Sequence, residues 1–157
     1  MIPLQIGDTA PQFNLPDQNG VLISLNSFIG IKKILVYFFP KAMTPGCTIQ
    51  ACKLRDNMHA FRKLNIEIIG ISNDTSEKLA KFSEKEMLNF TLLTDENNQI
   101  AKKFGVWGEK KFMGKPYNGI HRVSFIINQT GMIEQVFQHF KPVDHDQIVL
   151  RYLIDNN

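Results

Sequence analysis

Two cysteines, Cys47 and Cys52, are the residues of this 157-residue chain best suited to do chemistry. Cys47 follows Thr44, Pro45 and Gly46, a sequence typical of a helix start, because Thr is a favoured N-cap and Pro a favoured first residue. Gly46 lets a small substrate approach the backbone closely. In the first turn of a helix, unpaired N–H groups and the positive end of the dipole favour the reactive thiolate. We therefore predict a nucleophilic thiol at residue 47 rather than a buried, inert cysteine.

The spacing of the two cysteines limits how they can react with each other. Across five residues of a continuous helix the side chains point ~140° apart, and the Cα atoms lie roughly 8–9 Å apart. A disulfide needs a Cα separation below about 7 Å, so Cys47 and Cys52 can bond only if the helix unwinds locally. The alternative, that Cys52 is an unreactive helix residue, stays open on these grounds.

Other cysteine chemistries fit the sequence less well. A thioredoxin-type oxidoreductase would carry Cys-x-x-Cys, whereas four residues separate the cysteines here. A zinc or copper site would need further soft or imidazole ligands. The histidines occur singly, without ligand spacing, and are expected at the surface or at strand ends: His59, His121, His139 and His145. We therefore predict neither a metal nor a cofactor.

The reactive thiol must be positioned by the elements around it. Residues 31–39, directly before Pro40, form a continuous apolar run that predicts a strand covered on both faces. The other expected strands cover residues 66–72, 90–94, 122–128 and 132–140. The expected helices cover residues 47–64, 75–86, 98–104 and 144–154. Residues 12–15 and 21–25 flank a turn signal and predict a hairpin. The glycine- and lysine-rich residues 105–119 are expected to form a loop.

This order of elements predicts an α/β fold. Two buried parallel strands, followed by an antiparallel hairpin and a closing helix, are typical of a thioredoxin-like sandwich, with a central mixed sheet flanked by helices on both faces. The length fits one domain over residues 1–157.

Composition and charge exclude several classes of protein. A hydrophobic content of 43% and a charged content of 21% are ordinary for a soluble globular protein. The formal net charge of +3 and the lysines of residues 102–115, which lack an aromatic–basic motif, do not indicate a nucleic-acid site. Neither a secretory signal nor a membrane span is visible, so a cytoplasmic location is expected. There a cysteine pair is more often catalytic or metal-binding than a structural disulfide.

The motif Pro40-x-x-x-Thr44-x-x-Cys47 is similar to the active-site motif of the peroxiredoxins. The longer string at residues 39–48, with Cys52 after it, resembles the bacterioferritin comigratory protein, or peroxiredoxin Q, subfamily. Further similarity to this subfamily lies in residues 70–74, 104–110 and 119–125. The resemblance covers essentially the whole chain.

The resemblance implies a thiol peroxidase that acts on hydroperoxides. It implies that Cys47 is the peroxidatic and Cys52 the resolving cysteine, with an intrachain disulfide that thioredoxin reduces. It also implies that Thr44 and Arg122 bind and polarise the peroxide, while Pro40 shields the thiol from bulk water. A monomer is expected, because members of this subfamily are often monomeric.

In the implied cycle Cys47 attacks a peroxide oxygen and becomes a sulfenic acid. A thiol with a lower pKa is more ionised but is also a weaker nucleophile, so ionisation alone gives only a small gain in rate. Stabilisation of the departing oxygen by Thr44, Arg122 and backbone N–H groups must contribute more. Gln50 stands where many peroxiredoxins carry Glu, which we interpret as a mark of the subfamily. Two alternatives remain: a thiol–disulfide oxidoreductase acting on proteins, and a thioredoxin-fold chaperone or binding module with incidental cysteines.

Overall fold

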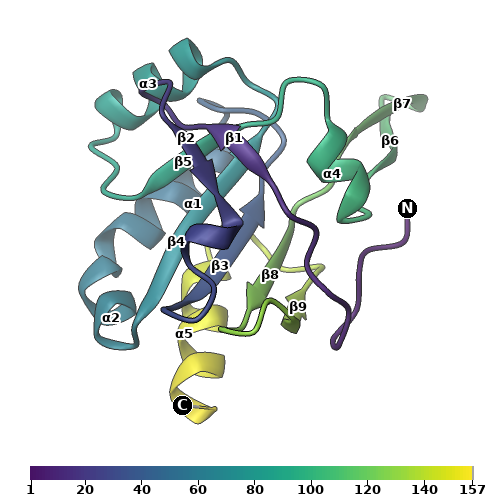
Figure 1. Cartoon of the computed structure of the whole chain (residues 1–157). Helices are drawn as coiled ribbons and strands as arrows, with labels where there is room; N and C mark the ends of the chain where they lie inside the picture. The colour runs from purple at the N-terminus through teal and green to yellow at the C-terminus, as the bar shows by residue number, and fades with distance from the viewer. Residues whose placement is uncertain (157) are drawn as a thin grey trace.

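A five-stranded sheet runs through the centre of the molecule in the spatial order β5-β4-β3-β8-β9 (Figure 1). The structure is a computed structural model and describes residues 1–156. Strands β3, β4 and β5 are parallel, whereas β8 is antiparallel to β3 and β9 to β8. The strands are β3 (Lys33–Phe38), β4 (Ile66–Ser72), β5 (Thr91–Thr94), β8 (Val123–Ile127) and β9 (Ile133–Phe137). The predicted central mixed sheet is thereby confirmed.

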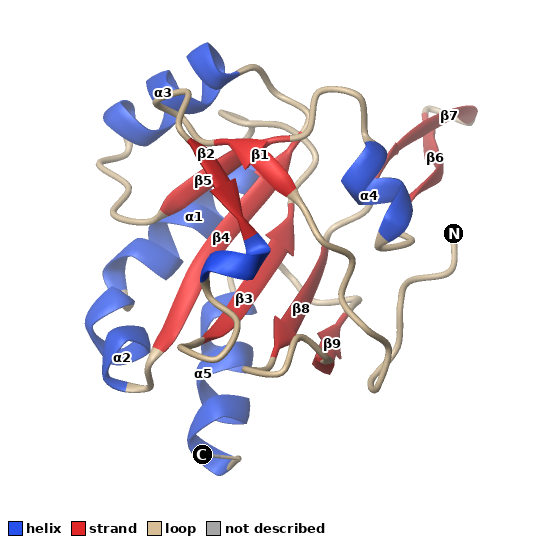
Figure 2. Cartoon of the chain, in the orientation of Figure 1, coloured by secondary structure: helices blue, strands red, loops and turns tan. Residues whose placement is uncertain are grey.

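Helices cover both faces of this sheet, as the sequence predicts (Figure 2). Along β3, Leu35 and Tyr37 face one hydrophobic cluster and Val36 faces the other, so the strand is buried on both sides. The helices of the first face are α1 (Pro45–Asp56), α2 (Met58–Lys63), α3 (Ser76–Lys85) and α5 (His145–Asp155). The second face is covered by the N-terminal arm, the 3-10 helix η1 (Leu25–Ser27) and α4 (Gln99–Lys103). Within residues 1–156, no helix combines the length and apolar character needed to cross a membrane.

The helix expected over residues 47–64 is wrong in its extent, because it is two helices, α1 and α2, that meet at Asn57. The Asn57 side-chain amide donates to the carbonyl of Lys53 at 3.2 Å and to Asp146 Oδ2 at 2.6 Å. An asparagine that hydrogen-bonds in this way competes with the regular backbone ladder and favours a break.

Two small antiparallel hairpins lie outside the central sheet. The hairpin expected near the N-terminus is confirmed as β1 (Asn14–Pro16) and β2 (Leu22–Ser24). The loop expected over residues 105–119 is wrong, because β6 (Trp107–Phe112) and β7 (Lys115–Ile120) pair and stand out from the body of the molecule (Figure 1). The intervening Met113 and Gly114 both have positive φ, as a tight two-residue hairpin turn requires.

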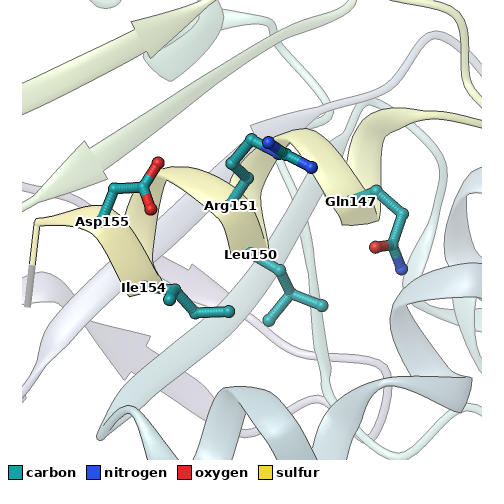
Figure 3. A pocket seen from close by; sticks show the side chains of 5 residues that line it. All are labelled: Gln147, Leu150, Arg151, Ile154 and Asp155. Carbon is teal, nitrogen blue, oxygen red and sulfur yellow. The ribbon is translucent and has the colours of Figure 1, made fainter.

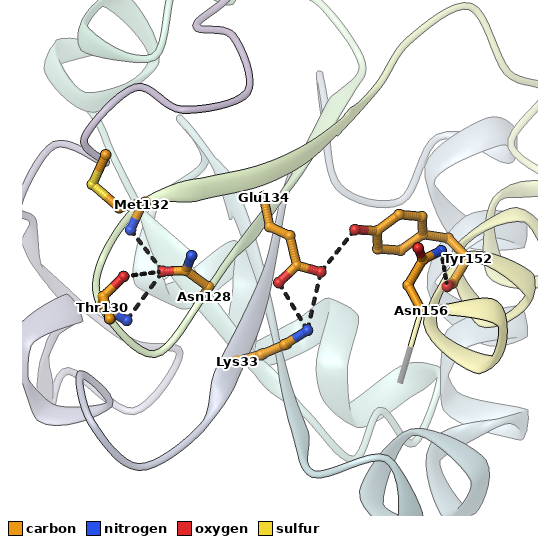
Figure 4. A network of polar contacts seen from close by, with 7 residues as sticks. All are labelled: Lys33, Asn128, Thr130, Met132, Glu134, Tyr152 and Asn156. Atoms are coloured by element: carbon orange, nitrogen blue, oxygen red, sulfur yellow. Dashed lines mark hydrogen bonds and ion pairs between the residues drawn. The ribbon is translucent and has the colours of Figure 1, made fainter.

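Helix α5 is fixed to the sheet by the polar network in Figure 4. The Tyr152 hydroxyl donates to Glu134 Oε2 on β9 at 2.7 Å, and Lys33 Nζ on β3 lies 2.8 Å from the other oxygen of the same carboxylate. The Asn128 side-chain oxygen accepts from the backbone N–H groups of Thr130 and Met132 and shapes the predicted turn between β8 and β9. One end of α5 is therefore tied to two strands of the sheet.

Candidate active site

One edge of the central sheet gathers the residues expected to do chemistry. Phe38, the last residue of β3, pairs with Ile71 of β4 and with Val123, the first residue of β8. The segments that follow β3 and β4 and the segment that precedes β8 therefore meet at the same edge. This topology brings the loop of Pro40 and the side chain of Arg122 to one place.

A buried carboxylate holds the loop that leads to α1. Asp74, which follows β4 and is 6% exposed, accepts from the backbone N–H of Ala42 at 2.8 Å and from the Ser72 hydroxyl at 2.7 Å. The Thr94 hydroxyl in turn donates to the Asp74 carbonyl. The sequence analysis assigned Asp74 no role beyond its place in a similar segment, although an acidic residue directly after a buried strand was a usable signal.

Helix α1 begins at Pro45 with Thr44 at the N-cap position, as predicted, since Thr44 has extended backbone angles. The Thr44 side chain, however, does not cap the helix. Its hydroxyl donates instead to the carbonyl of Lys41 at 2.8 Å, because the loop turns back at Met43, where φ is +66°. The helix start is therefore predicted correctly, but the Thr44 hydroxyl has a different partner.

Cys47 lies in the first turn of α1 and is 2% exposed. Its Sγ accepts a hydrogen bond from Arg122 Nη2 at 3.5 Å. Thr44, Gly46 and Arg122 beside it are only partly buried, so the thiol lies just beneath the surface. Gly46 has no room for a side chain without crowding, because a Cβ there would lie 3.3 Å from Arg122 Nη2. A side chain at position 46 would therefore press on the guanidinium that contacts the Cys47 sulfur.

A buried chain of hydrogen bonds continues inward from the guanidinium of Arg122. Arg122 Nη1 donates to Gln50 Oε1 at 2.5 Å, Gln50 Nε2 lies 3.1 Å from His145 Nδ1, and His145 Nε2 lies 2.7 Å from Ser124 Oγ. Gln50, His145 and Ser124 are fully buried. The expectation that His145 lies at the surface or at a strand end is therefore wrong. Its partners lie far away in the sequence, so no spacing pattern could reveal them.

His145 is neutral in this environment. Burial, with a smaller contribution from the nearby Arg122 charge, lowers the pKa of His145 to about 3. Because Gln50 Oε1 accepts a hydrogen bond from Arg122, Gln50 presents its NH₂ group to the imidazole ring. His145 Nδ1 therefore accepts from Gln50, and Nε2–H donates to Ser124. His145 thus links two polar side chains without adding a charge.

This burial predicts a pH dependence of stability. Between the ordinary histidine pKa near 6.5 and about 3, the unfolded state binds a proton that native His145 does not. The contribution of neutral His145 to the free energy of unfolding is therefore fully present above pH 6.5. It falls as the pH drops, by at most ~1.4 kcal/mol per pH unit. Urea unfolding of wild type and His145→Phe between pH 7 and pH 4.5 measures this pH dependence. The free energy of unfolding of the variant should fall less steeply with decreasing pH than that of wild type. Equal slopes in the two proteins would contradict the assignment.

Cys52 lies on the same unbroken helix, and both cysteines are free thiols. Cys52 is partly exposed, and its Sγ donates to Glu86 Oε2 at 3.7 Å. Burial raises the pKa of the Cys52 thiol; the Glu86 carboxylate adds to this effect and Arg55 opposes it. Cys52 is therefore held as a neutral thiol on α1. While this helix is intact, Cys47 and Cys52 are too far apart to form a disulfide.

Two hollows in the surface lie beside Pro40 and along α5. One, of about 240 Å³, adjoins Pro40 and is walled by the β6–β7 hairpin; it is lined by Pro40, Lys41, Asn73, Trp107, Lys110, Tyr117, Asn118, Gly119 and Ile120. The other, of about 310 Å³, lies along α5 (Figure 3) and is lined by Gln147, Leu150, Arg151, Ile154 and Asp155. Neither lining includes a cysteine or a histidine, but the first hollow adjoins the loop that leads to Cys47 at the start of α1. Among residues 1–156, no three His, Cys, Asp or Glu side chains gather to hold a metal ion.

Comparison with known proteins agrees with this geometry. The model of the AhpC/TSA family matches residues 6–136. Peroxiredoxin Bcp of Escherichia coli (strain K12) is 58% identical over 153 residues, which cover 98% of this chain and 97% of that protein. The crystal structure of peroxidoxin BcpB from Mycobacterium tuberculosis is similar with a TM-score of 0.87 and 32% identity, over 98% of this chain and 99% of that one.

A further similar structure is that of the Xanthomonas campestris bacterioferritin comigratory protein, described with an alkyl peroxide reduction activity. It has a TM-score of 0.86 and 28% identity, and the match covers 92% of this chain and 91% of that one. These similarities confirm the thioredoxin-like fold and the resemblance drawn from the motif of residues 40–47.

Proposed function

The chain belongs to the AhpC/TSA family and is a thiol peroxidase, and we propose that Cys47 is the thiol that attacks the hydroperoxide. The observation that carries the proposal is the contact of 3.5 Å between Cys47 Sγ and Arg122 Nη2 at the start of α1. A guanidinium at the sulfur stabilises negative charge there and remains charged at any pH the protein meets. The substrates are hydrogen peroxide and organic hydroperoxides.

In the first step the Cys47 thiolate attacks the terminal oxygen of the hydroperoxide. The S–O bond forms as the O–O bond breaks, and the electron pair leaves with the other oxygen, which takes up a proton to become water or an alcohol. Arg122 donates to the developing negative charge. The Thr44 hydroxyl, whose hydrogen points to Lys41, keeps an oxygen that accepts from the incoming hydroperoxide. Pro40, in the loop between β3 and α1, limits access of bulk water.

In the second step the Cys52 thiol condenses with the Cys47 sulfenic acid, and a disulfide forms as water is released. Since both cysteines lie on α1, the first turns of this helix must unwind before the two sulfurs can meet. Cys52 leaves its contact with Glu86 in the same movement. The cycle therefore includes a local unfolding of α1.

A dithiol protein must restore both thiols by exchange, and we propose that thioredoxin does so. A reducing cytoplasm, in which structural disulfides are rare, fits a cysteine pair that cycles between thiol and disulfide. We further propose that the 157 residues act as one domain and as a monomer. Gel filtration, together with peroxide consumption coupled to thioredoxin and its reductase, tests these points.

Intact-mass measurement after one equivalent of hydrogen peroxide tests the roles of the two cysteines. Wild type should lose two hydrogens, because Cys47 and Cys52 form a disulfide. Cys52→Ser should gain one oxygen instead, since its sulfenic acid has no partner thiol. Loss of two hydrogens as a mixed or intermolecular disulfide, or an unreacted Cys52→Ser protein, would contradict the assignment.

The same proteins separate the alternative functions. A thiol–disulfide oxidoreductase would reduce insulin disulfides faster than it consumes peroxide. A chaperone or binding module would prevent aggregation of a client equally well with both cysteines changed to serine. No contact in the described residues favours either alternative over peroxide reduction.

A further inference from the structure

His145 has no part in the two steps described, yet it belongs to the buried chain of hydrogen bonds that leads through Gln50 and Arg122 to Cys47. We propose that His145 is a positioning residue, which fixes the Gln50 side chain and through it holds the Arg122 guanidinium against the Cys47 sulfur. The inference rests on the proposed function of Cys47 and Arg122. It extends the active site to the first residue of α5.

The imidazole is held on several sides. Its Nε2 bonds to the Ser124 hydroxyl on β8 at 2.7 Å, and the ring stacks on Phe140 with centroids 4.6 Å apart. The Tyr37 ring lies on another side, with centroids 5.7 Å apart. Helix α5, which carries His145, is tied to the sheet through Tyr152 and Glu134 (Figure 4). The ring is therefore a fixed point for whatever bonds to Nδ1.

The ring nitrogen Nδ1 and the Arg122 guanidinium together hold the Gln50 amide in one orientation. With Nδ1 accepting, the NH₂ group of Gln50 turns to His145 and the carbonyl oxygen turns to Arg122. A rotated amide would present NH₂ to the guanidinium, donor against donor, and would leave two buried groups unpaired. Glutamine, unlike the Glu that many peroxiredoxins carry there, has two different ends, and His145 holds the NH₂ end while Arg122 holds the oxygen.

The orientation of Gln50 in turn decides the position of Arg122. The guanidinium is a rigid planar fork, so fixing Nη1 on Gln50 Oε1 also directs Nη2. Nη2 then lies 3.5 Å from Cys47 Sγ. The Arg122 side chain is partly exposed and belongs to a short segment between two strands, so without this anchor its charged end would turn toward water.

Two substitutions at His145 test the inference. His145→Phe keeps a ring to stack on Phe140 but removes both nitrogens, and should slow sulfenic acid formation with hydrogen peroxide about tenfold, ~1.4 kcal/mol. His145→Asn places an amide oxygen near the position of Nδ1, keeps the acceptor for Gln50 and should remain within about threefold of wild type. Equal rates for His145→Phe and wild type would overturn the inference.

A positioning role acts through Arg122, so the test includes the double variant Arg122→Met/His145→Phe. The second substitution should slow Arg122→Met no further, because the guanidinium that His145 serves is gone. Alkylation of Cys47 by iodoacetamide, which releases no oxygen anion, should fall less than the peroxide rate. Additive losses, or equal losses in alkylation and peroxide reduction, would show a general structural role instead.

Circular dichroism and thermal melting verify that each variant is folded. If His145→Phe does not fold, Ser124→Ala gives the same comparison, since it removes the partner of Nε2 and leaves the ring in place. It should slow the peroxide step severalfold in the wild-type background and not in Arg122→Met, and an unchanged rate in both would overturn the inference. A wild type that consumes no peroxide would instead refute the proposed function.

Discussion

Replacement of Cys47 by serine should abolish hydroperoxide reduction, with a loss of three orders of magnitude or more, ~4 kcal/mol. Serine keeps the size and the helix position, but its hydroxyl is not ionised near neutral pH and is a poor nucleophile toward peroxide oxygen. The contact from Arg122 would then hold an un-ionised hydroxyl. Peroxide consumption with excess dithiol reductant, at equal enzyme concentration, measures the loss.

Cys52→Ser is the matched control for this prediction. Cys52 touches Glu86 and lies away from the Arg122 guanidinium, so its removal should leave the first oxidation of Cys47 at the wild-type rate. Turnover should then depend on a reductant that attacks the sulfenic acid directly. If Cys47→Ser still consumes peroxide, or if Cys52→Ser slows the first oxidation as much, the two thiols do not have the roles proposed.

Arg122→Met should slow the peroxide step by tenfold or more, on the order of 1.4 kcal/mol or above. Methionine roughly preserves the length of the side chain but removes the donors that contact Cys47 Sγ and Gln50 Oε1. Both the thiolate and the departing oxygen lose a stabilising charge. Stopped-flow measurement of sulfenic acid formation, with hydrogen peroxide varied under pseudo-first-order conditions, gives the rate constant. We expect Thr44→Val to slow the same step by a similar factor.

Arg151→Met provides a control with the same chemical change. Arg151 lies on α5 at the hollow in Figure 3, apart from the Cys47 contacts, and its loss should leave the rate unchanged. Arg122→Lys keeps a charge without the planar fork and should recover only part of the rate. If a folded Arg122→Met reacts as fast as wild type, the charge on the departing oxygen is stabilised by other groups. An unchanged rate in a folded Thr44→Val would show that the Thr44 hydroxyl does not hold the hydroperoxide.

Elements whose formation depends on neighbouring residues were predictable from the sequence alone. The apolar run of residues 31–39 became the central strand β3, and Thr44 and Pro45 begin α1, because backbone preferences and burial patterns act over a few positions. The position of Cys47 in the first turn of α1 followed from the same local rules. So did the separation of Cys47 and Cys52 on one helix, which depends only on helix geometry.

The distant side chains that surround the sulfur could not be predicted in this way, because the fold of the whole chain brings them together. Arg122 and Gln50 are 72 positions apart, and Gln50 and His145 are 95 apart, yet each pair is in hydrogen-bond contact. The antiparallel placement of β8 beside β3 and the packing of α5 on α1 create these contacts. A single sequence contains no information on which strands or helices pair. His145 therefore had the pattern of an isolated surface residue, although in the folded protein it is buried beside Gln50.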